Sequence, residues 1–186
     1  MNQGKPQGSV RIIAGEWRGR KLPVLDKPGL RPTGDRMRET LFNWLQRHLG
    51  GARVLDLFAG TGALGFEALS RGATSATFLE KDAQLVANLR GISAMLQANG
   101  DIHQADALQW LARNTDAGFD VVFVDPPFAD GLHAQVLMLL DAVTHAGSLI
   151  YVEAPIRENI TVPTQWRVLK ESQTRDVAAK LLQRVQ

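Results

Sequence analysis

The stretch Arg53-Val-Leu-Asp-Leu-Phe-Ala-Gly-Thr-Gly-Ala-Leu-Gly65 decides the fold of this chain of 186 residues. It begins with a short apolar run, typical of a strand buried on both faces of a parallel sheet. Gly60-Thr61-Gly62 follows, and glycines allow the backbone to turn sharply and to approach a ligand closely. Residues 63–71 then predict a helix that Gly72 ends. A strand, a glycine turn and a helix in this order predict an α/β sheet whose ligand lies at the carboxyl end of the strand.

The glycines alone fit two kinds of ligand. Gly60, Gly62 and Gly65 match the G-x-G-x-x-G pattern of dinucleotide-binding proteins, and Glu80 follows about 20 residues later, as a ribose-binding acid does. Asp56, however, lies just before the turn, where its carboxylate would repel a pyrophosphate and attract a cation. S-adenosylmethionine carries an adenosine, a positive sulfonium and an amino group, and it has no phosphate. The acid therefore favours the methyl donor over NAD.

Length and composition predict a soluble protein of one domain. No apolar run approaches the ~20 residues of a membrane span and the N-terminus lacks the apolar segment of a signal peptide, so we expect a cytoplasmic protein. The absence of cysteine excludes disulfides, thiolate metal sites and cysteine nucleophiles, and it disfavours methylation at carbon 5 of a pyrimidine. We expect no metal, because the histidines are scattered without metal-ligand spacing: His48, His103, His133 and His145.

Positive charge is concentrated in the N-terminal part of the chain. Residues 1–38 hold nine basic and three acidic side chains, a net charge of +6, which leaves −4 for the remainder of a chain with a total of +2. This asymmetry indicates a polyanionic partner for the N-terminal segment.

The same segment predicts a β-hairpin, with short strands at 10–14 and 20–24 around a turn at 15–19. Its basic residues are interspersed with Trp17, a combination that suits phosphate contacts and base stacking. We favour RNA contact over the alternative, in which a solvated hairpin packs its tryptophan on the main domain.

Strands and helices alternate through the remainder of the chain, which predicts an α/β fold with a mostly parallel sheet. Thr33 can cap a helix at 34–49, whose apolar side chains recur at helical spacing. The other predicted helices are 82–98, 108–114 and 130–145, and the predicted strands are 75–79, 101–104, 119–124 and 148–152, followed by two closing strands.

Two acids that follow strands suit an adenosine. Glu80 ends strand 75–79, and its carboxylate can accept hydrogen bonds from both ribose hydroxyls. Asp106 follows strand 101–104 and can accept a hydrogen bond from the exocyclic amine of adenine. Capping of the next helix explains Asp106 equally well.

Asp125-Pro-Pro-Phe128 follows the clearest strand and carries the chemistry. Two prolines fix the loop and remove two amide donors, so the loop presents acceptors, which are the Asp125 carboxylate and the Pro126 carbonyl. An exocyclic amine brings two N–H donors to such a site, and Phe128 can stack on its base. Hydrogen bonds to these oxygens would stabilise the positive charge that develops on nitrogen during direct methyl transfer. The alternative is a rigid corner between strand and loop.

Together these residues resemble class I methyltransferases that modify exocyclic amines, and more closely the RsmD family of bacterial 16S ribosomal RNA guanine-N2 methyltransferases. The match covers most of the chain. Two of its motifs are specific to the family, Arg11-Ile-Ile-Ala-Gly-Glu-Trp-Arg-Gly-Arg-Lys-Leu22 and Arg31-Pro-Thr-Gly-Asp-Arg-Met-Arg-Glu-Thr-Leu-Phe-Asn-Trp-Leu45. Residues 56–73 and 125–128 match patterns that occur across many methyltransferases.

The resemblance implies a Rossmann-like class I methyltransferase fold, with a seven-stranded, mostly parallel sheet that has one antiparallel strand and a small N-terminal β-hairpin extension. We accordingly expect disorder over residues 1–9, a basic hairpin extension over 10–32 and the methyltransferase domain over 33–186. The implied cofactor is S-adenosylmethionine, and the implied acceptor is a guanine of 16S rRNA (guanine 966 being the family's usual target). The implied partner of a monomeric enzyme is the 30S subunit or its assembly intermediate.

The resemblance also implies roles for individual residues. Asp125, Pro126, Pro127 and Phe128 would hold the guanine and form the catalytic group. The cofactor would contact Asp56, Phe58, Gly60, Thr61, Gly62, Glu80, Lys81, Asp106, Ala107 and Asp125. RNA would contact Arg11, Trp17, Arg18, Arg20, Lys21, Arg31, Thr33, Arg36 and Arg38.

One stretch departs from the family. The last strands of RsmD family members typically carry a glycine and tyrosines, whereas the corresponding stretch here, Thr174-Arg-Asp-Val-Ala-Ala-Lys-Leu-Leu182, has neither residue type. Three other functions remain as alternatives: methylation of adenine N6 in RNA or DNA, an NAD-dependent oxidoreductase that uses Gly60 to Gly65, and an RNA-binding assembly factor without catalysis.

Overall fold

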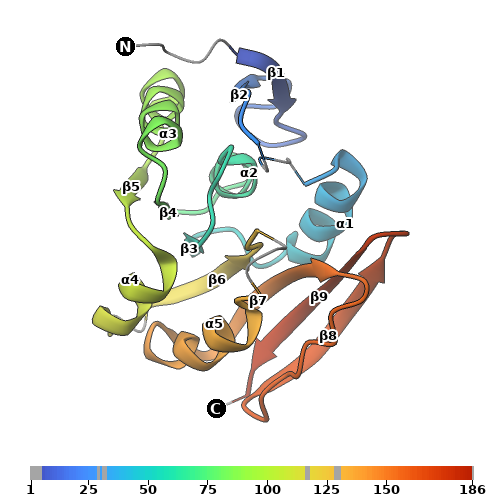
Figure 1. Cartoon of the computed structure of the whole chain (residues 1–186). Helices are drawn as coiled ribbons and strands as arrows, with labels where there is room; N and C mark the ends of the chain where they lie inside the picture. Colours follow the sequence, from blue (N-terminus) through green and yellow to red (C-terminus); the bar gives the residue numbers. More distant parts are fainter. Residues whose placement is uncertain (1–5, 29, 31–32, 116–117, 128–130, 186) are drawn as a thin grey trace.

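The computed structural model describes residues 6–28, 30, 33–115, 118–127 and 131–185 and contains two sheets (Figure 1). The large sheet has seven strands in the order β5-β4-β3-β6-β7-β9-β8, and β1 and β2 form a separate antiparallel hairpin. The strands are β1 Pro6–Arg11, β2 Lys21–Leu25, β3 Arg53–Asp56, β4 Ser75–Glu80, β5 Gly100–Gln104, β6 Phe119–Val124, β7 Thr144–Pro155, β8 Trp166–Gln173 and β9 Val177–Arg184.

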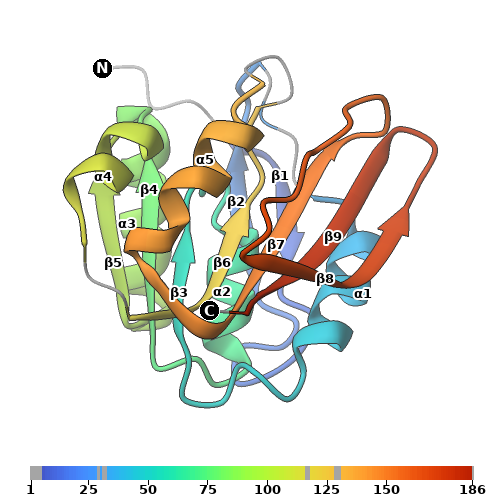
Figure 2. The same cartoon turned by 90° about the horizontal axis from the view of Figure 1, so that it is seen from below.

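Five neighbouring strands, from β5 to β7, run parallel, and β9 is antiparallel to both of its neighbours. The predicted sheet with two closing strands and one antiparallel strand is therefore confirmed. Helices cover both faces (Figures 1 and 2). They are α1 Asp35–Leu45, α2 Ala63–Ser70 and α3 Ala83–Leu96 on one face, and α4 Ala107–Arg113, α5 His133–Leu139 and the 3₁₀ turn Leu140–Ala142 on the other.

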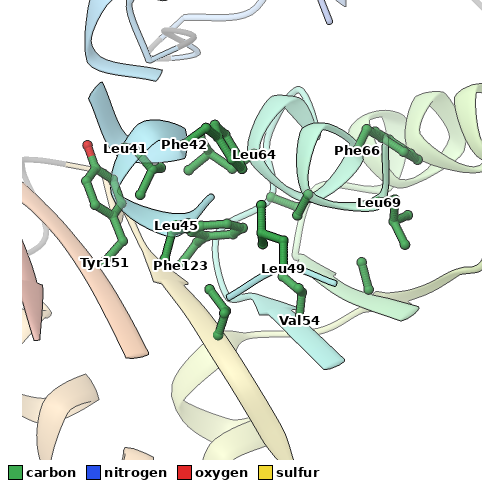
Figure 3. Packing of buried hydrophobic residues seen from close by; sticks show 14 of the residues in the cluster. Leu41, Phe42, Leu45, Leu49, Val54, Leu64, Phe66, Leu69, Phe123 and Tyr151 are labelled. Atoms are coloured by element: carbon green, nitrogen blue, oxygen red, sulfur yellow. The ribbon is translucent and has the colours of Figure 1, made fainter. Parts of the chain in front are cut away.

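The core under α1 joins this helix to the middle of the sheet (Figure 3). Phe42 of α1 meets Phe123 of β6 edge to face, with the ring centroids 6.0 Å apart, and Phe123 meets Tyr151 of β7 in the same manner at 6.5 Å. All three rings are completely buried. This packing holds the second half of α1 against β6 and β7.

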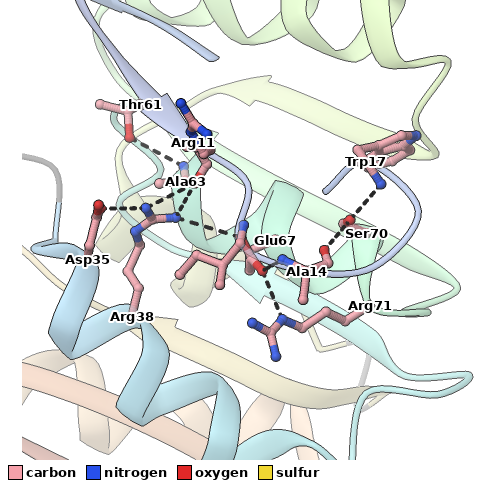
Figure 4. A network of polar contacts seen from close by, with 11 residues as sticks. Arg11, Ala14, Trp17, Asp35, Arg38, Thr61, Ala63, Glu67, Ser70 and Arg71 are labelled. Atoms are coloured by element: carbon pink, nitrogen blue, oxygen red, sulfur yellow. Dashed lines mark hydrogen bonds and ion pairs between the residues drawn. The ribbon is translucent and has the colours of Figure 1, made fainter. Parts of the chain in front are cut away.

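A buried glutamate attaches the hairpin segment to the main sheet domain (Figure 4). Glu67 of α2 is completely buried, and its carboxylate accepts hydrogen bonds from the backbone N–H groups of Ile13 at 2.8 Å and Ala14 at 3.0 Å. Arg38 of α1 lies 3.7 Å from the same carboxylate and donates to the Arg11 carbonyl at 3.0 Å. We call these contacts of Glu67 and Arg38 the hairpin clasp. The hairpin is consequently docked on α1 and α2.

Three predicted boundaries were wrong. Residues 6–9 are strand and not disordered, because they pair with β2 as far as Leu25, whereas residues 1–5 lie outside the described residues. Helix α1 begins after Gly34 and not after a capping Thr33, and it ends at Leu45 and not at residue 49. The helix predicted over 130–145 is shorter, because Thr144 already pairs with Phe119 at the start of β7. Among the described helices, none is long and apolar enough to cross a membrane.

Gly65 allows α2 to lie close to β4, and we predict that Gly65→Ala destabilises the fold. A methyl group at Gly65 would lie 2.2 Å from a ring carbon of the buried Phe78. Such overpacking costs about 1–3 kcal/mol, against which alanine regains about 1 kcal/mol of helix propensity. Urea unfolding should therefore show a lower midpoint. The matched control is Gly91→Ala on the exposed side of α3, where nothing lies within 4 Å, and it should raise the midpoint. Equal midpoints for the two variants would contradict the proposed close contact.

Candidate active site

Four carboxylates lie at the carboxyl ends of four adjacent strands. Glu80 ends β4, Asp56 ends β3, Asp125 directly follows β6, and Glu153 lies near the end of β7. Because these strands are parallel neighbours, their carboxyl ends meet at one edge of the sheet. The glycine turn and the loop that begins at Asp125 therefore follow neighbouring strands, β3 and β6. Glu153 belongs to the same row and was missed by the sequence reasoning.

The glycine turn is held by two of these acids. Gly62 precedes α2 with a φ of 77°, in the left-handed region that favours glycine. The Asp56 carboxylate accepts a hydrogen bond from the Gly65 N–H at 3.3 Å. Glu80 accepts hydrogen bonds from Gly60 N–H at 3.0 Å and Asp82 N–H at 2.9 Å, one on each oxygen. Each of these oxygens keeps a second lone pair, so Glu80 can still accept hydrogen bonds from a ligand.

The row of acids makes the edge of the sheet attractive to a positive charge. Burial is the main reason that the pKa of Asp56 rises to about 7, and the nearby Glu80 raises it further. Burial also raises the pKa of Asp125 well above its usual range, and the charges of Glu153 and Asp56 add to this effect. A cationic ligand placed among these groups would offset their repulsion and favour their ionised forms.

The loop after β6 contains Asp125 and Pro126, the two residues predicted to supply hydrogen-bond acceptors. Asp125 is half-buried, Pro126 is buried and Pro127 is exposed, whereas Phe128 lies outside the described residues. The Thr33 hydroxyl, which precedes α1, donates a hydrogen bond to Asp125 Oδ2 at 3.2 Å. Thr33 was predicted to contact RNA, but it is buried against this carboxylate. It links the N-terminal segment to the loop after β6.

The predicted cofactor residues follow the ends of β3, β4, β5 and β6. Asp106 caps α4 by accepting a hydrogen bond from the Gln109 N–H at 3.0 Å, so the capping interpretation is confirmed and an adenine contact stays a prediction. The residues placed along this edge are Asp56, Phe58, Gly60, Thr61, Gly62, Glu80, Lys81, Asp106, Ala107 and Asp125. Across the described part of the chain, no group of three acidic or histidine side chains is arranged to hold a metal ion.

The segment between the hairpin and α1 adds two residues that sequence reasoning missed. The Leu30 side chain lies against Gly60, at 3.2 Å from the position that a Cβ atom would take. Lys27 forms an ion pair with Asp82 at 2.5 Å, and this pair lowers the pKa of Asp82. These contacts bring described residues of the segment to the ends of β3 and β4, where the cofactor is expected.

Most residues predicted to bind RNA are exposed, but three of them are not: Trp17, Arg38 and the buried Thr33 described above. Trp17 is half-buried against the core, and its backbone N–H donates to the Ser70 hydroxyl at 2.9 Å, so the packing interpretation is confirmed for its ring (Figure 4). Arg38 was wrongly predicted to contact RNA, because it is 1% exposed within the hairpin clasp. Arg31 lies outside the described residues. The exposed residues are Arg11, Arg18, Arg20, Lys21 and Arg36.

Comparison with known proteins agrees with this arrangement. The chain is 46% identical over 184 residues to Ribosomal RNA small subunit methyltransferase D of Escherichia coli K12, an alignment that covers 95% of this chain and 91% of the relative. It is 47% identical over 184 residues to the protein of the same name from Haemophilus influenzae, with 95% of each covered. The solved structure of the putative methyltransferase yhhF from Escherichia coli matches with a TM-score of 0.89 and 43% identity, covering 96% of this chain and 99% of that one.

These matches confirm the Rossmann-like methyltransferase fold that the sequence predicts. The family model described as Conserved hypothetical protein 95 matches residues 10–183, which is nearly the whole chain. The chain therefore belongs to this family, the RsmD family that its motifs resemble.

Proposed function

We propose that this protein transfers the methyl group of S-adenosylmethionine to the exocyclic N2 of a guanine in 16S rRNA, within the small ribosomal subunit or its assembly intermediate. Its relatives are named as rRNA small subunit methyltransferases. The observation that carries the proposal is the pairing of β3 with β6, which brings a carboxylate suited to a cationic donor beside a loop suited to an amine. An activity on ribosomal subunits would put the protein in the cytoplasm.

The cofactor part of the proposal depends on the glycine turn and the acids around it. Asp56 is buried beneath the turn, where a pyrophosphate would face an acid. Glu80 keeps lone pairs free for the two hydroxyls of a ribose. The cofactor supplies an electrophilic methyl group on a positively charged sulfur, and the four carboxylates provide the negative charge that would hold it at the sheet edge.

The acceptor part depends on Asp125 and the Pro126 carbonyl. Both can accept hydrogen bonds from the two N–H bonds of an aryl amine, whose lone pair is otherwise delocalised into the ring. Their oxygens would orient the amine and stabilise the charge on nitrogen as the N–C bond forms and the C–S bond breaks. The proton that the methylated amine loses passes to Asp125 or to water. Phe128 would stack on the base.

Adenine N6 in RNA or DNA is the second candidate acceptor, because adenine offers the same amino group to Asp125. An NAD-dependent oxidoreductase leaves Asp56 and Asp125 without a role, and an assembly factor without catalysis leaves both carboxylates without one. Calorimetry with S-adenosylmethionine and NADH separates a methyltransferase from an NAD-dependent oxidoreductase. Binding of NADH without binding of S-adenosylmethionine would overturn the proposal.

The test of the function is transfer of a labelled methyl group to 30S particles from cells that lack this modification. Mass spectrometry of the digested RNA should find N2-methylguanosine. Labelled N6-methyladenosine would support the second candidate, and no label in either nucleoside would contradict both. Free 16S rRNA in parallel reactions shows whether the particle or the RNA is the substrate.

Asp125→Ala should abolish methyl transfer while S-adenosylmethionine still binds. The substitution removes the charged acceptor of the amine, and loss of one such group typically lowers kcat by about 10²–10³-fold. Single-turnover rates measure the loss, and calorimetry measures cofactor binding. The control is Asp176→Ala, an exposed acid outside the site. Wild-type turnover by Asp125→Ala would remove Asp125 from the mechanism.

The affinity for S-adenosylmethionine should fall as the pH falls through about 7. Because the pKa of Asp56 is raised to about 7, the carboxylate that would attract the cation is mostly protonated below that pH and mostly ionised above it. Calorimetry from about pH 8 to about pH 6 should show weaker binding by up to about tenfold. Asp56→Asn should bind weakly over the whole range. An affinity of the wild type that does not change with pH would contradict this role of Asp56.

Replacing Arg18, Arg20 and Lys21 together by alanine should weaken RNA binding and make it less dependent on salt. Each lost phosphate contact reduces the slope of log K against log salt by roughly one unit. Titrations of labelled RNA at several salt concentrations measure the slope. Arg113→Ala with Lys170→Ala removes exposed basic residues outside the hairpin and serves as the control. An unchanged slope in the triple variant would show that the hairpin does not contact phosphates.

A further inference from the structure

The register of the sheet places Glu153 directly beside Asp125. Val124 of β6 pairs with Val152 of β7, so the residues that follow these two valines are neighbours on strands that lie about 4.8 Å apart. Side chains alternate along a strand, and Tyr151, two residues before Glu153, packs in the core under α1 (Figure 3). The Glu153 carboxylate therefore lies on the face of the sheet that α1 covers.

Both carboxylates are held through one of their two oxygens. The Thr33 hydroxyl, which precedes α1, donates to Asp125 Oδ2 at 3.2 Å. The buried Tyr151 hydroxyl donates to Glu153 Oε2 at 2.9 Å. The buried His133 fixes the backbone there, because its Nε2 donates to the Glu153 carbonyl at 2.8 Å. A carboxylate has about four lone-pair sites, so each acid keeps acceptor capacity for a ligand.

The strand order decides what Glu153 can contact. Strand β6 lies between β3 and β7, so Asp125 has the glycine turn on one side and Glu153 on the other. The side of the glycine turn is the one proposed for the cofactor. A base whose exocyclic amine reaches Asp125 therefore has the Glu153 carboxylate beside it, on the side away from β3. Glu153 is 7% exposed, so a contact with it is largely shielded from water.

Guanine and adenine differ in the atom that lies next to the exocyclic amine. In guanine the N2 amine lies beside N1–H, so this edge of the base presents a continuous row of donors. In adenine the N6 amine lies beside the N1 lone pair, which is an acceptor. Enzymes that act on an extruded base read it through hydrogen bonds to this edge. A second carboxylate next to Asp125 therefore complements guanine and would face an acceptor of adenine.

We propose that Glu153 is the residue that selects guanine over adenine, by accepting a hydrogen bond from guanine N1–H while Asp125 and the Pro126 carbonyl hold the amine. This inference rests on the function proposed above and gives that function its choice of base. With adenine in the same place, the Glu153 carboxylate would lose water without gaining a hydrogen bond, which is costly for a buried charge. Accepting from N1–H would also leave more electron density on the guanine amine, which is a weak nucleophile.

The charges around the pair support an ionised Glu153. Burial raises the pKa of both acids, and the negative charges of Glu153 and Asp56 add to the effect of burial on the pKa of Asp125. The hydrogen bond from Tyr151 opposes the rise in the pKa of Glu153. Glu153 therefore loses its proton before Asp125 does in the free protein. A cationic cofactor beside Asp125 would lower the pKa of that acid in the complex.

The test exchanges the atom that Glu153 is proposed to read. The base 2-aminopurine keeps the amine at C2 but has a lone pair at N1, where guanine has N1–H. A synthetic segment ligated into 16S rRNA places either base at the methylated position, and the RNA is then assembled into 30S particles. Single-turnover transfer by the wild type should be faster on guanine by at least about 100-fold, because the analogue leaves the buried acid unpaired.

Glu153→Gln should remove most of this discrimination. Its amide can accept from guanine N1–H or donate to the N1 lone pair of the analogue, and its oxygen can still accept from Tyr151, so the ratio of rates should fall to about tenfold or less. Glu153→Leu can do neither and should be slow on both bases. Glu171→Gln, at an exposed acid on β8, is the control and should keep the wild-type ratio.

The fluorescence of 2-aminopurine, which rises when the base leaves its stack, gives a measurement without methyl transfer. It should rise more on binding of Glu153→Gln than on binding of the wild type. Equal rises would show that Glu153 does not read the base.

The outcomes separate this inference from the proposed function. If the wild type methylates guanine but accepts 2-aminopurine equally well, or if Glu153→Gln keeps the wild-type ratio, the inference is wrong and the function stands. An unchanged ratio with a higher KM for S-adenosylmethionine would assign Glu153 to the cofactor and would also overturn the inference. A wild type that transfers no methyl group to guanine contradicts the function and the inference together.

Discussion

The parallel pairing of β3 with β6 is the constraint on which the site depends. Asp56 pairs with Phe123, so the glycine turn and the Asp125-Pro126 loop leave the sheet side by side. The glycine turn and the Asp125-Pro126 loop belong to separate motifs that lie far apart in the sequence, and only the pairing of the strands brings them together. The strand order of the large sheet reverses between β3 and β6, the position at which open parallel sheets bind their ligands. The chemistry proposed for the site follows from this position.

The sheet could be predicted from the sequence because its central strands are short, strongly apolar and separated by segments with helical spacing of apolar residues. Residues 119–124 are almost continuously apolar, and residues 60–62 can form only a tight turn. The acids at strand ends could be predicted for the same reason, since a charged residue after an apolar run marks the carboxyl edge of the sheet. Those parts of the fold depend on the order of neighbouring residues, which can be seen in a single sequence.

The residues that were missed or misplaced depend on contacts between distant segments. Glu153 follows an apolar run as Asp125 does, but Ala154 comes next and a single proline only at position 155, so it looked like an ordinary strand end. Arg38 lies off the apolar stripe of α1 and was predicted to contact RNA, yet Glu67 attracts it into the interior. One signal was available, because Glu67 is the single acid in a helix of otherwise small or apolar residues, where a buried charge requires a partner.

The hairpin clasp has a mechanical consequence. Glu67 lies on α2, the helix that begins at the glycine turn, and it holds the basic hairpin through Ile13 and Ala14. Helix α2 therefore connects the surface proposed to contact phosphates with the site proposed for the cofactor. Because α2 fixes the distance between these two regions, the protein would select an RNA whose contacted phosphates and target base lie that distance apart. A folded particle that presents that distance would fit without rearrangement, whereas a loose strand would lose entropy in adopting it.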